Sequence, residues 1–263
     1  MTDSSSNAVY EPAARVFIGT SGFSYSPWKP LFYPKGLASR DWLAYYARHY
    51  NTVEINATFY RPFGQAIMAR WHDVTPDGFR FTLKGPKLIT HTRQLQAVEA
   101  DLAAFMASLE PLRPKLALLL WQFPPGFQYN DSTISTLDQF LRLLPADSRS
   151  VLEFRHKSWF TPAVYALLNT RRVGFVISDS PQYPAADIST GGLVYVRFHG
   201  PGTLYRSPYS PEALADWATR LRNWLLPTAP RQPAAIEQLY CYFNNTMEGW
   251  ALPNAVTLRN LID

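Results

Sequence analysis

The chain repeats one pattern eight times: a short apolar or β-branched run, then turn residues, then usually a segment with helical spacing of its apolar residues. Alternation of this kind is typical of parallel βαβ units, in which helices connect neighbouring strands. The predicted strands are Val16 to Thr20, Thr52 to Asn56, Phe79 to Lys84, Lys115 to Gln122, Val151 to Arg155, Gly174 to Ser178, Leu193 to His199 and Leu239 to Asn244. The fourth run is almost continuously apolar, as expected for a strand covered on both faces. The sequence therefore predicts an α/β fold with a parallel sheet.

Helix signals fill most of the gaps between these strands. The predicted helices are Arg40 to His49 capped by Ser39, Ala66 to Trp71 with Pro62 before its first turn, Leu95 to Leu109, a segment capped by Ser132 that reaches Leu144, one opened by Thr161 and Pro162, and one opened by Ser210 and Pro211. Serine and threonine favour the cap position, and proline is tolerated in the first turn. Between Asp179 and Leu193 two prolines and two glycines predict a short or distorted connection instead of a full helix.

Eight βα units either close into a barrel or lie open as a doubly wound sheet. The chain has 263 residues, close to the roughly 250 residues of a (β/α)8 barrel. No GxGxxG or GxxxxGK[ST] motif follows the first predicted strand, so the best support for an open nucleotide-binding sheet is missing. We predict a single TIM-type (β/α)8 barrel over residues 15–263, preceded by a flexible, serine-rich tail over residues 1–14.

Composition narrows the class of protein further. Hydrophobic residues make up 47% and charged residues 17%, so widespread disorder is excluded. Cys241 is the only cysteine, which excludes an internal disulfide, and its apolar surroundings predict a buried thiol. The N-terminus lacks an apolar targeting segment, and no apolar run is long enough to span a membrane. We predict a cytoplasmic protein without membrane association. Its oligomeric state stays open.

Polar residues at the ends of the predicted strands point to the functional site, because barrel enzymes build their sites from the loops that follow the strands. Three strands end in polar pairs spaced i, i+2, which places both members of a pair on one face. The pairs are Glu54 with Asn56, Glu153 with Arg155, and Arg197 with His199. If this face is the barrel interior, the six residues converge with Lys84 around one mouth. A buried ion network would produce the same pattern and is the structural alternative.

An anion site is the preferred chemistry for this mouth. Lys84, Arg155, Arg197 and His199, with the backbone amides of Gly200 and Gly202, are suited to hold a phosphate or carboxylate. Aromatic residues in the predicted loops are suited to stack on a sugar or base; these are Tyr25, Trp28, Tyr60, Trp159 and Tyr205. The net charge of +5 also favours anionic partners.

Two other chemistries stay open but are less favoured. Glu153, Asp179 and His199 come from successive strands and would suit a divalent metal, yet no HExxH motif or cysteine pair exists, so we predict no metal ligands and leave the cofactor unknown. Retaining glycoside hydrolysis needs two carboxyl groups about 5 Å apart, and the spacing of Glu54 and Glu153 is not fixed by the sequence.

Seven segments together resemble the DUF72 or YecE-like family in unbroken order from about Phe17 to Asn245. They read GTSGFSYSPW with FYPKG, YNTVEINATFYRPF, FRFTLKGPKLITH, LLLWQFPPGF, LEFRHKSW, YVRFHG and YCYFNN. The resemblance implies a TIM-type barrel of uncharacterised function. The shared polar and aromatic positions that it implies for the site are Tyr25, Trp28, Glu54, Asn56, Tyr60, Lys84, His91, Gln122, Glu153, Arg155, Trp159, Asp179, Arg197, His199, Asn244 and Asn245.

These observations lead to one preferred hypothesis and two alternatives. The preferred hypothesis is an isomerase-like or hydrolase-like enzyme for a small polyhydroxylated or phosphorylated compound. Glu54 or Glu153 would be the general base and His199 or His91 the acid, while Lys84, Arg155 and Arg197 would hold the negative charge. The alternatives are a protein that binds or processes nucleic acid, and a barrel that binds a ligand without turnover.

Overall fold

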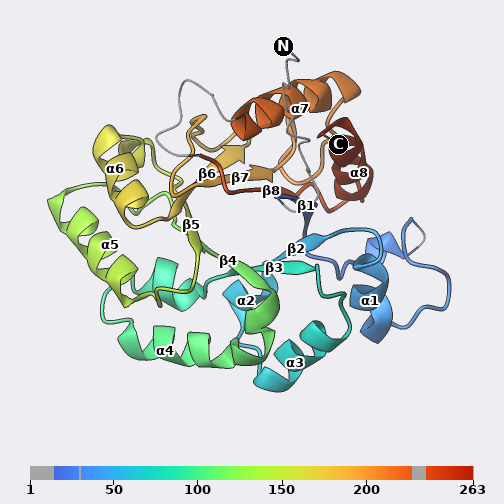
Figure 1. Cartoon of the computed structure of the whole chain (residues 1–263), viewed down its shortest axis with the longest axis horizontal. Coiled ribbons are helices and arrows are strands. Elements are labelled where there is room, and N and C mark those ends of the chain that lie inside the picture. The colour runs from blue at the N-terminus through green and yellow to red at the C-terminus, as the bar shows by residue number, and fades with distance from the viewer. Residues whose placement is uncertain (1–14, 30, 227–234, 263) are drawn as a thin grey trace, which may run out of the picture.

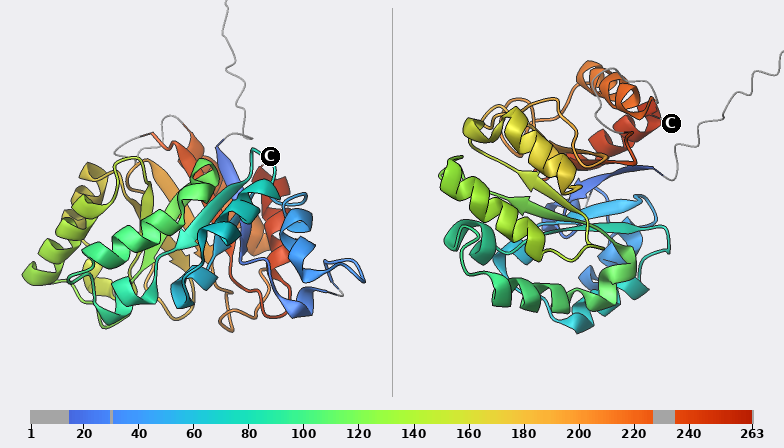
Figure 2. Two further views of the ribbon diagram at one scale, coloured as in Figure 1. Left: turned by 90° about the horizontal axis from the view of Figure 1, so that it is seen from below. Right: turned by 60° about the vertical axis from the view of Figure 1, so that its left-hand side comes forward.

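Eight parallel strands close into a barrel in chain order, with helices outside them (Figure 1, Figure 2). The computed structural model describes residues 15–29, 31–226 and 235–262, so the predicted tail lies outside the described residues. The strands are β1 Val16–Ser21, β2 Thr52–Ile55, β3 Arg80–Lys84, β4 Leu116–Gln122, β5 Ser150–Glu153, β6 Gly174–Asp179, β7 Leu193–Phe198 and β8 Gln238–Phe243. The pairing of β8 with β1 closes the ring. The predicted (β/α)8 barrel is confirmed, and each predicted strand overlaps an observed one.

Helices of unequal length connect the strands. The α-helices are α1 Trp42–Tyr46, α2 Ala57–Tyr60, α3 Gln65–Asp73, α4 Glu99–Ser108, α5 Asp131–Leu143, α6 Pro162–Thr170, α7 Pro211–Leu225 and α8 Ala251–Ile262. Short 3-10 turns lie at Ser26–Trp28, Ser39–Asp41, Glu110–Lys115 and Lys157–Trp159, and a π-helical turn lies at Leu88–Thr92. Within the described residues no helix is both long and apolar enough to cross a membrane.

Two predicted helix starts are confirmed and one is wrong. The hydroxyl of Thr161 accepts a hydrogen bond from the Val164 amide at the start of α6, and Ser210 caps α7 in the same way. Ser132, however, lies inside α5. Asn130 caps that helix in a reciprocal capping box with Thr133, because an asparagine one residue before the helix satisfies the same free amides.

Two further predicted helices begin too early, whereas the one predicted from Ala66 to Trp71 is confirmed as α3. Ser39 lies in a 3-10 turn without a capping hydrogen bond, and α1 begins only at Trp42. Pro62 lies in the loop between α2 and α3, and Gly64 precedes α3.

The predicted helix from Leu95 loses its first turn for a backbone reason. Gln94, Leu95 and Ala97 have φ values of 45°, 69° and 50°, which a right-handed helix does not accommodate. Helix α4 therefore begins at Glu99.

The connection from Asp179 to Leu193 contains no helix in the structure, as predicted. The C-terminal helix α8 was not predicted from the sequence. It packs against β1, β8 and α7, and so covers the seam where the barrel closes.

The barrel interior is filled at its N-terminal end, which determines where a ligand site is available. Phe17, Leu118, Val151, Tyr195 and Tyr240 belong to a buried interior cluster. The next inward position along β7 after Tyr195 is Arg197, while Val196 and Phe198 belong to the separate cluster under the helices. Apolar packing therefore gives way to polar side chains at the C-terminal ends of the strands. Cys241 is buried among the outer cluster, as predicted.

Candidate functional site

A cavity of about 600 Å³ lies over the C-terminal ends of the strands. This volume falls within the roughly 300–1,000 Å³ of small-molecule sites. All eight strands or the loops that follow them contribute to its lining, which consists of Tyr25, Asn56, Phe59, Tyr60, Lys84, Lys87, His91, Gln122, Pro124, Pro125, Arg155, Tyr183, Arg197, Tyr205, Asn244, Thr246 and Met247. The position is the one at which barrel enzymes carry their active sites.

Arg197, at the end of β7, lies between two buried glutamates below the cavity. Its Nε donates to Glu54 Oε2 at 3.0 Å and its Nη2 to Glu54 Oε1 at 2.8 Å. Its Nη1 donates to Glu153 Oε2. The parallel pair of bonds to Glu54 is the bidentate geometry that a planar guanidinium favours. The site thus has an ionic floor, which we define as Glu54, Glu153, Arg155 and Arg197.

Glu54 has no oxygen available for proton transfer in this arrangement. Besides the two bonds from Arg197, Oε1 accepts from the Ser21 hydroxyl and Oε2 from the Tyr195 hydroxyl, both at 2.6 Å. The carboxylate is fully buried. It does not line the cavity, so the predicted role as general base requires rearrangement; its contacts instead orient Arg197.

Glu153, at the end of β5, is equally occupied. Oε1 accepts from Arg155 Nε at 2.9 Å, and Oε2 accepts from Arg197. Burial alone would raise the pKa of Glu153, but Arg155 and Arg197 outweigh it and hold this pKa well below its usual range. Glu153 is therefore ionised at neutral pH. Two carboxylates and two guanidiniums make the floor neutral in sum, as in the ion network considered from the sequence.

The two candidate histidines lie in different places. His199 is fully buried below the cavity, where its Nδ1 lies 3.1 Å from Asn244 Nδ2 and its Nε2 has no hydrogen-bond partner among the described residues. Burial lowers the pKa of His199 well below its ordinary value. His91 lines the cavity, and partial burial followed by the charges of Lys84 and Lys87 lowers its pKa to about 4. Both imidazoles are neutral at pH 7.

Lys84 ends β3 and faces the cavity from its wall. Its Nζ donates to Gln122 Oε1 at 2.8 Å and lies 3.9 Å from the centre of the Phe59 ring. Burial, followed by the positive charge of Arg197, lowers the pKa of Lys84 from 10.5 to about 7. At neutral pH this amine exists in both protonation states.

Phenol rings form much of the remaining wall. Tyr25, Tyr60 and Tyr205 line the cavity as the aromatic prediction requires, and Tyr183 joins them. The guanidinium of Arg155 stacks on Tyr183 at 3.6 Å from the ring centre. The sequence reasoning missed Tyr183 because its connection lacks a helix and resembled a plain loop.

Lys87 and Phe59 were also missed, although both had a signal. Lys87 follows the strand-end residue Lys84 by three positions, and Phe59 lies in the short helix α2 that also supplies Tyr60.

The two predicted tryptophans do not reach the cavity. Trp28 is fully buried, and its indole donates to the Thr246 carbonyl. Trp159 is fully buried too, donates to the Phe127 carbonyl and stacks on Phe154 at 4.6 Å. Their rings hold the βα loops onto the barrel, because a large apolar surface with a satisfied N–H is most stable in the core.

Asp179 and Asn245 also lie apart from the cavity lining. Asp179 Oδ2 accepts from the indole of Trp217, so it faces α7. Asn245 is buried and donates to the Ser207 carbonyl and to Asn254 Oδ1. Of the other candidate site residues, Asn56, Gln122 and Asn244 line the cavity.

The metal and glycosidase alternatives lack the geometry they need. The carboxylate of Asp179 faces α7, which separates it from Glu153 and His199, and the described part of the chain contains no cluster of three metal-ligating side chains of His, Cys, Asp or Glu. Arg197 occupies the space between Glu54 and Glu153, where a glycosidic bond would have to lie.

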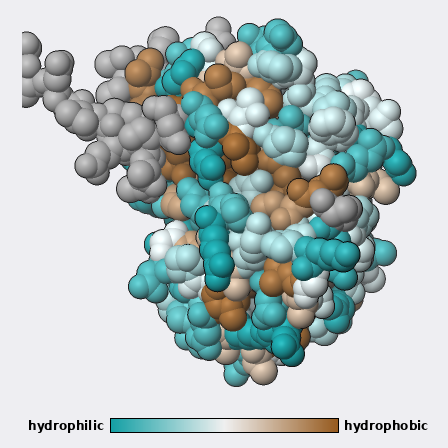
Figure 3. Space-filling model, turned by 90° about the vertical axis from the view of Figure 1, so that its right-hand side faces the viewer, coloured by the Kyte–Doolittle hydropathy of each residue, from teal (hydrophilic) through white to brown (hydrophobic). Residues whose placement is uncertain are grey.

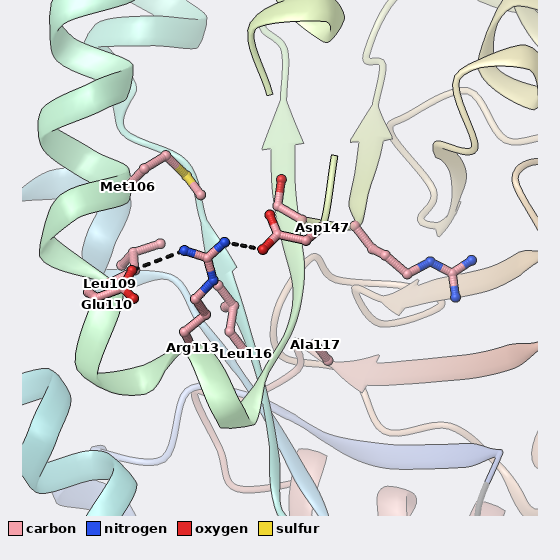
Figure 4. A pocket seen from close by; sticks show the side chains of 9 residues that line it. Met106, Leu109, Glu110, Arg113, Leu116, Ala117 and Asp147 are labelled. Atoms are coloured by element: carbon pink, nitrogen blue, oxygen red, sulfur yellow. Dashed lines mark hydrogen bonds and ion pairs between the residues drawn. The ribbon is translucent and has the colours of Figure 1, made fainter. Parts of the chain in front are cut away.

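Other depressions on the surface are poorer candidates. The one in Figure 4 holds only about 50 Å³, and the exposed Arg113 pairs with Glu110 and Asp147 within it. A groove beside α8 is lined by Leu31, Phe32 and other mainly apolar residues. It lies on the α1 and α8 side of the molecule, where Figure 3 shows hydrophobic residues scattered among hydrophilic ones.

Comparison with known proteins agrees with the sequence resemblance. The family profile described as "Protein of unknown function DUF72" matches residues 17–263. The UPF0759 protein YunF of Bacillus subtilis is 27% identical over 94% of this chain and 95% of its own length. The UPF0759 protein YecE of Escherichia coli K12 is 27% identical over 82% of this chain and 84% of its own.

Solved structures give the same result for the fold. A DUF72 family protein from Thermotoga maritima superimposes with a TM-score of 0.82 at 28% identity, covering 94% of this chain and 99% of the other. A DUF72 family protein from Enterococcus faecalis superimposes with a TM-score of 0.78 at 23% identity, over 94% and 95% of the two chains.

Proposed function

Because this chain belongs to the DUF72 family, whose function is unknown, we propose from the site itself that the cavity is an enzyme active site for a small anionic, polyhydroxylated compound. One observation carries the proposal. Glu54 and Glu153 are both buried and occupied by guanidiniums, so among the described residues no free carboxylate lines the cavity, which is rich in N–H and O–H donors.

The charge of the lining supports an anionic compound. The ionic floor is neutral in sum, so the positive excess comes from Lys84 and Lys87. Preorganised cations and amide donors in a partly desolvated cavity bind phosphate or carboxylate groups well. Three amide side chains and four phenols provide partners for hydroxyl groups; these are Asn56, Gln122, Asn244, Tyr25, Tyr60, Tyr183 and Tyr205.

The groups that face the cavity also limit how a reaction would proceed. Because both glutamates are occupied, proton transfer falls to Lys84, to the neutral His91 or to a phenol. A group with a pKa near 7 is the most effective acid–base catalyst at neutral pH. Lys84 therefore replaces the glutamates as the preferred general base for an isomerase-like or hydrolase-like reaction.

Calorimetry with glucose 6-phosphate, glucose and inorganic phosphate tests the binding. We expect glucose 6-phosphate to bind more tightly than glucose, and Lys87→Ala to weaken it about fivefold, the effect of losing roughly 1 kcal/mol of screened attraction. The matched control is Lys35→Ala, another exposed lysine that lies outside the cavity lining. Equal affinities for the sugar and its phosphate would contradict the proposal.

A turnover assay distinguishes an enzyme from a barrel that only binds a ligand and from a protein that binds nucleic acid. Phosphorus NMR of a mixture of sugar phosphates should show conversion by the wild-type protein and none by Lys84→Met. Binding without conversion would favour a non-catalytic barrel. Binding of a single-stranded oligonucleotide that weakens steeply with salt would instead favour the nucleic-acid alternative.

A further inference from the structure

Lys84 is a buried lysine without a carboxylate partner. Its residue is 8% exposed, and no Asp or Glu oxygen of the described chain lies within 4.0 Å of its Nζ in an ion pair. The nearest acidic group along the floor, Glu153, is occupied by Arg155 and Arg197. A buried ammonium is normally paired because burying an unpaired charge is costly. The position therefore favours the neutral amine.

A second buried lysine shows the contrast. Lys115 is 4% exposed, and its Nζ donates to the carbonyls of His72 and Thr75 at 2.7 and 2.6 Å and contacts the Thr75 hydroxyl at 3.4 Å. Three oxygen acceptors solvate this ammonium, which lies outside the cavity lining. Lys84 has a single oxygen acceptor and an aromatic face instead. The oxygen atoms around Lys115 suit a charged ammonium with a structural role, whereas the surroundings of Lys84 do not.

Burial is the largest cause of the lowered pKa of Lys84, and the charged groups around this lysine act on its pKa in opposing directions. Arg197 and Arg155 lower it, whereas Glu153 and Glu54 raise it. These four groups come from three strands: Glu54 lies in β2, Glu153 ends β5 with Arg155 two residues after it, and Arg197 lies in β7. Lys87 and His91, from the segment after β3, line the same cavity. Among these charges Arg197 has the largest effect, and it is the neighbouring cation that disfavours a protonated Lys84. Desolvation and a neighbouring cation are the two conditions under which a lysine becomes a nucleophile at neutral pH. The pKa of about 7 agrees with this geometry.

Gln122 fixes the direction of the amine. Its Nε2 donates to the Phe123 carbonyl at 2.9 Å, which assigns Oε1 to the side that faces Lys84. One N–H of Lys84 is thereby directed to Gln122, and Phe59 covers another side. The remaining side of the amine is left for the cavity, which Lys84 lines.

We propose that Lys84 forms a covalent imine with a carbonyl carbon of the compound held in the cavity; this rests on the proposed function and narrows its substrate class to anionic aldehydes and ketones. The Lys84 nitrogen attacks the carbonyl carbon and forms a C–N bond while the carbonyl oxygen takes up a proton. The hydroxyl formed in this way leaves with one further proton as a single water, and the nitrogen lone pair forms the C=N bond; the two N–H protons that the amine loses balance the two that the water carries. The step consumes no oxidant or reductant, and the imine then activates the carbon beside it for proton transfer. Because the Lys84 nitrogen is then bound to carbon, His91 or a lining phenol takes over from Lys84 as the base for that transfer.

Reductive trapping of the full-length protein tests the imine. The chain has six lysines, and incubation with dihydroxyacetone phosphate and cyanoborohydride at pH 7 converts any imine into a stable secondary amine. Peptide mass spectrometry should place the adduct on Lys84 at a rate at least about tenfold above any other lysine, because an ordinary lysine with a pKa near 10.4 is almost wholly protonated at pH 7. Lys84→Arg should abolish this adduct, and the control Lys35→Arg should retain it.

The outcomes separate this inference from the proposed function. If glycerol 3-phosphate, which lacks a carbonyl, binds the folded wild type but no adduct forms on Lys84, the imine is excluded and the anion site stands. If neutral dihydroxyacetone labels Lys84 as fast as its phosphate does, the imine stands and the anion site is excluded. Labelling that is spread evenly over the surface lysines would contradict the proposal that Lys84 forms an imine.

Discussion

Replacing Arg197 by methionine should lower the free energy of unfolding by about 3–5 kcal/mol, the largest effect expected for any single substitution considered. The side chain neutralises Glu54 and Glu153, both of which are fully buried. Removing one partner of a buried ion pair leaves an uncompensated charge, and the cost of such a change lies in this range. Urea denaturation of Arg197→Met and wild type measures the difference.

Two further variants test the cause. Adding Glu54→Gln to Arg197→Met removes the stranded charge, so the double variant should be more stable than Arg197→Met alone, and it serves the test if the single variant does not fold. Arg113 also pairs with two carboxylates, those of Glu110 and Asp147, but at the surface. Arg113→Met should leave the urea midpoint almost unchanged. Similar losses from both arginine substitutions would argue against a role for burial.

The free energy of unfolding should depend less on pH in Lys84→Met than in the wild type. We expect its change between pH 7 and pH 9.5 to differ by about 3 kcal/mol between the two proteins. The pKa of Lys84 is about 7 in the folded protein and near 10.4 in an unfolded chain, so the unfolded chain binds more protons throughout this window. The contribution of Lys84 to the stability of the wild type is therefore most favourable above about pH 10. This contribution is lost as the pH falls toward 7. Methionine does not titrate and has no such dependence.

The measurement is the difference in unfolding free energy between wild type and Lys84→Met at several pH values. Other titrating groups cancel in this difference because the two proteins share them. Lys35→Met, at an exposed position, serves as the control and should follow the wild type at every pH. A wild-type curve parallel to that of Lys84→Met from pH 7 to 9.5 would show that Lys84 is protonated like any surface lysine.

The barrel and the polar strand ends beneath the candidate site were predictable because both depend on local patterns. Period-two spacing placed Glu54, Glu153 and Arg197 on inward positions, and parallel strands bring their C-terminal ends to one mouth. Lys84 and Gln122 were found for the same reason, since each ends a strand. The helix starts were less predictable: Ser132 and Asn130 are both good caps, and the choice between them depends on where the loop meets the barrel.

Roles within the site depended on long-range partners. Trp28 and Trp159 look like ligand-stacking residues in a loop, but their N–H groups bond to carbonyls 218 and 32 residues away. Asp179 ends a strand as Glu153 does, yet it bonds to Trp217 on α7. A side chain at the end of a strand turns inward or outward according to the register of its strand and the packing above it. Neither the register nor this packing can be read from the sequence.

By itself, the sequence determined a closed α/β barrel with carboxylates and cations at its mouth, because strand periodicity and turn chemistry act over a few residues. Only the tertiary structure decided which of those charges are available. It pairs both glutamates with Arg155 and Arg197 and leaves Lys84 with an amide and a ring. The strength of an ionic contact depends on distance and on exclusion of water, and both are set by residues that are far apart in the chain.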